Sequence, residues 1–115
     1  MKMPALVTRA ARAALDKKAE DVVVLDLRKG AGAAFTDFFV LASGANQRQL
    51  VAIADAVQEA LREDGIRPTH VEGYPRQEWI LLDYPAFIVH VFTPRTRVFY
   101  DLERLWGGAS RTEMR

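Results

Sequence analysis

The sequence predicts an α/β fold, with a mixed sheet of about five strands flanked by helices. Apolar runs at 22–27, interrupted only by Asp26, and at 38–42 are typical of strands that are buried on both faces. Apolar residues at helical spacing over 50–61 predict an amphipathic helix after the second strand. Two further apolar runs, at 79–84 and 87–92, are separated by only a short loop and predict a strand hairpin.

The start of the chain predicts a helix over residues 5–19. Pro4 suits its first position, where the missing N–H costs nothing, and good helix formers dominate the segment. Its apolar stripe is weak, so we expect the helix to pack lightly or to face a partner. The stripe consists of Leu6, Ala10, Ala13 and Ala14. After the first strand, a glycine-containing segment at 28–34 predicts a loop.

The central helix has clear start and stop signals. Asn46 is a strong N-cap candidate, and Gln49 completes a capping-box pattern with it. Gly65 suits the left-handed position that follows a helix. A short strand at 69–72 and a loop at 73–76 are expected before the hairpin.

A two-residue loop at 85–86 would pair Tyr84 with Phe87 and place His90 opposite Leu81. Other registers of the hairpin stay open, because Pro-Ala is not a favoured hairpin turn.

The sequence predicts one last helix at the end of the fold. Thr93 can cap it, with Pro94 at its first position, and its aromatic residues up to Trp106 would seat it on the sheet. Gly107 and its neighbour would end it, and 109–115 is expected to form a flexible tail.

The composition of the chain argues against several classes of function. The chain has 115 residues and a net charge of +1, whereas a protein that grips phosphates would show a basic excess. It has no cysteine, which excludes disulfides and cysteine-based zinc sites. No apolar run approaches the ~18 residues of a membrane span, and no signal-peptide pattern opens the sequence. We therefore expect a single cytoplasmic domain over 1–115, without cofactor or metal.

Asp83 and His90 interrupt otherwise apolar strands. In the predicted register they share a sheet face and lie on a diagonal. A carboxylate that orients an imidazole is half of a nucleophilic triad, but no serine lies in a nucleophile-elbow pattern. A structural hydrogen bond between Asp83 and His90 is the favoured interpretation. Metal-assisted phosphoryl transfer is disfavoured because no Asp-x-Asp pair occurs.

Aromatic residues with polar groups gather near the hairpin. Tyr74, Trp79 and Tyr84, together with Arg76, are of the types that dominate binding hot spots. Such aromatics are equally common at the edges of cores. The group is the best candidate for a protein-binding patch.

Several ordered blocks of the chain resemble the ribosomal silencing factors, or Iojap-like proteins. The blocks lie at 37–44, 48–49, 53–55, 71–73, 79–84, 89–92 and 99–106. The resemblance as a whole extends from about residue 14 to residue 106, and the order and separations of the blocks are highly specific.

The resemblance implies a fold like that of the nucleotidyltransferases without the catalytic carboxylates, and a function that is not enzymatic. Such factors bind the large ribosomal subunit through its fourteenth protein, at the face where the small subunit docks. They block subunit joining and repress translation when nutrients are scarce, and relatives are also linked to large-subunit maturation. A near-neutral charge suits a site made of protein, with little direct nucleic-acid recognition.

The resemblance also implies that the strand at 79–84 is the contact, with Trp79 as anchor and Asp83 as a partner for a basic side chain. The sequence departs from the family at Pro85 and Ala86, which border this strand. Two other hypotheses stay open. One is a nucleotide-binding or nucleotidyltransferase-type enzyme, and the other is a homodimer that associates through its aromatic edge.

Overall fold

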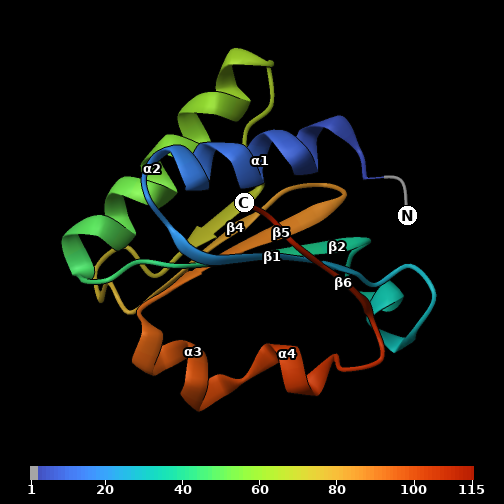
Figure 1. The fold of residues 1–115 in the computed structure, drawn as a ribbon. Helices are drawn as coiled ribbons and strands as arrows, with labels where there is room; N and C mark the ends of the chain where they lie inside the picture. The colour runs from blue at the N-terminus through green and yellow to red at the C-terminus, as the bar shows by residue number, and fades with distance from the viewer. Residues whose placement is uncertain (1–2) are drawn as a thin grey trace.

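The computed structural model describes residues 3–115 as one six-stranded mixed sheet with helices on both faces (Figure 1). The elements are α1 (Ala5–Asp16), β1 (Glu20–Asp26), the 3-10 helix η1 (Ala31–Ala34), β2 (Phe38–Ser43), α2 (Gln47–Glu63), β3 (His70–Glu72), β4 (Trp79–Asp83), β5 (Phe87–Phe92), α3 (Pro94–Tyr100), α4 (Leu102–Leu105) and β6 (Ser110–Glu113). The α/β class and the two-sided covering are therefore confirmed. No helix in this part of the chain has the length and apolar character needed to cross a membrane.

The strands lie in the order β3-β4-β5-β2-β1-β6. The central neighbours β2 and β5 are parallel, and every other pair is antiparallel. Every residue of β2 is buried, as expected for a strand covered on both faces. The hairpin register is as predicted, because His90 lies opposite Leu81 and the Tyr84 N–H donates to the Phe87 carbonyl at 2.9 Å.

The helices α1 and α2 lie side by side over one face of the sheet (Figure 1). The expectation that α1 packs lightly is wrong. Four of its residues are fully buried, namely Val7, Ala10, Ala11 and Ala14. Their small side chains leave a weak apolar signal in the sequence, but small residues allow two helices to pack closely.

Helix α1 ends at Asp16, three residues before the predicted end. The chain reverses at Lys18, whose φ is 62°. Gln49 holds this turn, because its side-chain amide donates to the carbonyls of Lys17 and Lys18 at 3.2 and 2.9 Å. The predicted N-cap is confirmed, since the Asn46 side chain accepts from the Gln49 N–H at 2.9 Å. The start of α2 therefore also fixes the end of α1.

The C-terminal region differs most from its prediction. The expected single helix is divided into α3 and α4, because Asp101 adopts a left-handed conformation with φ 46°. The segment expected to be a flexible tail contains β6, which pairs with the outer edge of β1 from Asp26↔Ser110 to Val23↔Glu113. The sheet consequently has six strands rather than five.

Gly73 allows two backbone segments to meet beside β4. Its φ is +98°, and a Cβ at this position would lie 1.9 Å from the Trp79 carbonyl oxygen. Only glycine fits such an approach. Gly73 therefore fixes the loop before β4 and the position at which Trp79 enters the sheet.

We predict that Gly73→Ala lowers the free energy of unfolding by about 2 kcal/mol or more, because it adds a clash to an unfavourable φ. Chemical denaturation of the variant would measure this. Gly30→Ala is the matched control, since a Cβ at Gly30 meets nothing within 4 Å. Equal stability of the two variants would contradict the packing at Gly73.

Candidate partner-binding surface

Several apolar side chains of the segment after β5 are exposed on the side of the sheet opposite α1 and α2. The short helices α3 and α4 cover this side of the sheet (Figure 1). Val98 and Phe99 of α3 are each 78% exposed, and Tyr100 is 51% exposed. A contiguous apolar patch on a protein surface commonly marks an interaction site. We call the surface formed by Trp79, Leu81, Phe99 and Tyr100 the aromatic face.

Trp79 joins this surface to the core beneath it. Its ring centroid lies 4.7 Å from that of Tyr100 and 5.1 Å from that of Phe92. Its indole Nε1 donates to Nδ1 of His90 at 3.1 Å. The indole N–H is therefore satisfied inside the protein, and the half-buried ring is what Trp79 can offer to a partner.

The predicted hydrogen bond between Asp83 and His90 is wrong. His90 bonds to Trp79 instead. His90 is 4% exposed, and the Phe39 ring stands edge-on to it at 4.6 Å between centroids. Its Nε2 has no hydrogen-bond partner among residues 3–115. Burial lowers the pKa of His90 to about 3, so the imidazole is neutral at physiological pH.

Asp83 lies at the end of β4, on the same face as Trp79 and Leu81 by strand alternation. Its main-chain carbonyl accepts from the Thr69 N–H at 2.7 Å and from the Thr69 hydroxyl at 3.0 Å. Its half-exposed carboxylate makes no hydrogen bond or ion pair to another side chain in the described part of the chain. Asp83 therefore presents a negative charge beside the aromatic face.

The other predicted patch residues do not join Trp79. Tyr84 is 1% exposed and stacks on Phe87 in the core under α1 and α2. Tyr74 packs on that same side, where its hydroxyl donates to Asp55 of α2 at 2.8 Å. Burial, together with this hydrogen bond, raises the pKa of the Tyr74 phenol. Arg76 is exposed in the loop before β4.

The exposed side chains of α3 were missed as contact candidates. The sequence predicts that Phe99 or Tyr100 seats this helix on the sheet. One signal could have identified them, because Val98, Phe99 and Tyr100 are consecutive. Three successive apolar residues of a helix cannot all face one side.

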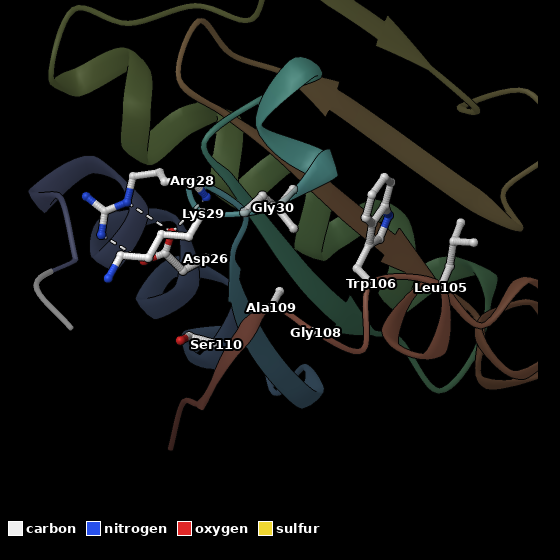
Figure 2. Close-up of a pocket in the computed structure, with 10 residues that line it drawn as sticks. Asp26, Arg28, Lys29, Gly30, Leu105, Trp106, Gly108, Ala109 and Ser110 are labelled. Carbon is white, nitrogen blue, oxygen red and sulfur yellow. Dashed lines mark hydrogen bonds and ion pairs between the residues drawn. The ribbon is translucent and has the colours of Figure 1, made fainter.

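The same side of the sheet also holds a cavity of about 570 Å³ between the loop after β1 and the loop before β6. Figure 2 shows Trp106 and Leu105 at one end of this cavity and the charged side chains at the other. There the Arg28 guanidinium binds both carboxylate oxygens of Asp26, at 3.0 and 2.7 Å. This hydrogen bonding holds the pKa of Asp26 below its ordinary value. Within residues 3–115, no three acidic or histidine side chains form a metal site.

We predict that His90 makes the fold acid-sensitive. The ordinary pKa is 6.5 and the folded value is about 3, so between these values the unfolded chain binds a proton that the folded chain excludes. The free energy of unfolding should fall as the pH drops below 6.5, by up to about 1.4 kcal/mol per unit.

Denaturation of wild type and His90→Gln at pH 7 and pH 5 measures this effect. Glutamine keeps an acceptor for Trp79 but does not titrate. The variant should lose less stability than wild type over this interval. Identical pH dependence of wild type and His90→Gln would contradict the prediction.

Comparison with known proteins agrees with the resemblance of the sequence blocks. The model of the family "Ribosomal silencing factor during starvation" matches residues 1–115. A relative from Halalkalibacterium halodurans, named ribosomal silencing factor, is 39% identical over 109 residues, which cover 95% of this chain and 92% of the relative.

A crystal structure of a Chromobacterium violaceum protein superposes with a TM-score of 0.86 at 33% identity, covering 100% of this chain and 94% of that one. A mouse protein named mitochondrial assembly of ribosomal large subunit protein 1 is 31% identical over 75 residues, which cover 63% of this chain and 33% of the mouse protein. The chain therefore belongs to the ribosomal silencing factor family.

Proposed function

We propose that this chain binds the large ribosomal subunit through its aromatic face, contacts the fourteenth protein of that subunit, and prevents the small subunit from joining. The observation that carries the proposal is the exposure of Phe99 and Tyr100 beside the packed indole of Trp79. Family membership supports a role in translation regulation. The name of the mouse relative supports the large subunit as the partner.

The chemistry of the aromatic face favours a protein partner. Large aromatic side chains held in place by packing provide binding energy at a small entropic cost. Trp79 is held by His90 below and by Tyr100 beside it. Asp83 at the border of the face would pair with a basic side chain of the partner. The net charge of +1 gives no broad attraction to ribosomal RNA.

The proposed mechanism is steric competition. A factor that occupies the surface where the subunits meet excludes the small subunit without any chemical step. The fraction of blocked subunits then follows the concentration of the factor relative to its dissociation constant. Higher amounts of the factor during nutrient limitation would lower translation, and a factor bound early would accompany maturation of the large subunit. This function requires neither cofactor nor metal.

We predict that Trp79→Ala weakens binding to the large subunit by about tenfold or more, because it removes the half-buried aromatic anchor of the aromatic face. Asp83→Lys should also weaken it, because a positive charge would face the basic partner. Co-sedimentation with purified large subunits measures both effects, and circular dichroism verifies the fold.

Glu59→Lys provides the matched control, since it makes the same charge change at an exposed position of α2, on the opposite side of the sheet. It should bind as wild type does. Small subunits added to the bound complex should fail to form joined ribosomes on a gradient. Normal joining in the presence of saturating wild-type protein would overturn the proposed function.

A further inference from the structure

Helix α3 is attached to the sheet by a buried charge. Within Pro94–Tyr100, all of which the structure describes, Arg97 is the only buried residue, at 9% exposure. Its Nε donates to Oε1 of Glu103 at 2.9 Å, and its Nη1 donates to the Ser43 hydroxyl at 2.9 Å and the Asp21 carbonyl at 2.7 Å. One guanidinium thus connects α3 with α4, β2 and β1.

The strand β1 is irregular at the point where it accepts a hydrogen bond from this guanidinium. Its pairing with β2 is irregular between Glu20 and Val23, where the register shifts. Asp21 lies in this irregularity with φ 49°, a left-handed conformation that is uncommon outside glycine but that Asp adopts more readily than most residues. The Asp21 carbonyl accepts from Arg97.

Glu103 continues the network to the edge of the sheet. Its second carboxylate oxygen accepts from Arg111 of β6 at 2.6 Å. Burial raises the pKa of Glu103, but hydrogen bonds and charge from Arg97 and Arg111 outweigh burial and hold it below its ordinary value. The carboxylate is therefore ionised at neutral pH and bridges two guanidinium groups. Because a guanidinium donates in a fixed planar geometry, these bonds determine orientation as well as attraction.

This attachment explains why the apolar side chains of α3 face outward. A helix held by its apolar residues would bury them, whereas Val98 and Phe99 are 78% exposed. Arg97 takes the inward position in their place. The polar anchor leaves the neighbouring apolar residues free for a partner and keeps Tyr100 against Trp79.

We propose that Arg97 is the positioning residue of the aromatic face. Its bonds to Glu103, Ser43 and the Asp21 carbonyl fix α3 so that Phe99 and Tyr100 are presented beside Trp79 before a partner arrives. A surface fixed in advance loses less conformational freedom on binding. The contribution of Arg97 to affinity rests on the proposed function, whereas its role in ordering α3 and α4 does not.

The test uses Arg97→Met, which keeps the aliphatic part of the side chain, and Arg95→Met on the exposed side of the same helix as control. Hydrogen exchange in the full-length protein should become at least about tenfold faster over 94–106 in Arg97→Met, with β2 amides unchanged. Large-subunit binding should weaken in parallel. Arg95→Met should match wild type in hydrogen exchange. Glu103→Gln should give a smaller change in the same direction, and it carries the test if Arg97→Met does not fold.

Unchanged exchange over 94–106 in a folded variant would overturn the ordering role of Arg97. Faster exchange together with wild-type affinity for large subunits would overturn its role in positioning the binding surface. Failure of the wild-type protein to bind large subunits would instead count against the proposed function, and the exchange comparison would still decide whether Arg97 orders α3.

Discussion

The parallel pairing of β2 with β5 is the constraint on which the rest of the structure depends. Parallel neighbours cannot be joined by a tight turn, so the chain must cross over one face of the sheet between them. That crossover contains α2, which with α1 covers this face. The central strands are apolar on both sides, so the opposite face also needs a cover. The segment after β5 supplies it in the form of α3 and α4.

The two covers are held in different ways. On one side, alanine, valine and leucine side chains of α1 and α2 pack into a continuous apolar core. On the other, a smaller apolar cluster is supplemented by the Trp79–His90 hydrogen bond and the Arg97–Glu103 ion pair. Apolar packing tolerates small rearrangements, whereas hydrogen bonds to a guanidinium require a defined geometry. The helix α3 and the Trp79 ring, which present aromatic side chains to solvent, are thus oriented by polar contacts.

Much of the sheet could be predicted from the sequence because burial on both faces leaves apolar runs. A two-residue loop between the runs at 79–84 and 87–92 predicts the hairpin register, and His90 lies opposite Leu81 as expected. The strand β6 could not be predicted, since its Ser-Arg-Thr-Glu sequence has no apolar alternation and its pairing depends on an open edge of β1. At the break between α3 and α4, Asp101 caps α4 by accepting from the Arg104 N–H at 3.3 Å. The likeness to nucleotidyltransferases stays a prediction.

The candidate site was predictable only in part. Strand alternation correctly placed Trp79, Leu81 and Asp83 on one face. The same alternation puts Tyr84 on the opposite face, with Ile80 and Leu82, and there the structure buries it. Alternation gave no information on Tyr74, whose position depends on how a loop folds back onto α2. Nor could it show that the indole N–H would be taken by His90, because that bond depends on how Trp79 and its neighbours pack in three dimensions.

The place of β6 in the chain has a consequence for biosynthesis. It follows every other described element in the sequence, yet it pairs with β1, which is synthesised before the other strands of this sheet. Until β6 is available, the outer edge of β1 has unpaired N–H and C=O groups that can template the addition of a strand from another molecule. The nascent protein therefore passes through a stage in which its first strand is open to association with other chains. The polar composition of Ser110–Glu113 limits the same hazard at the edge of the finished sheet.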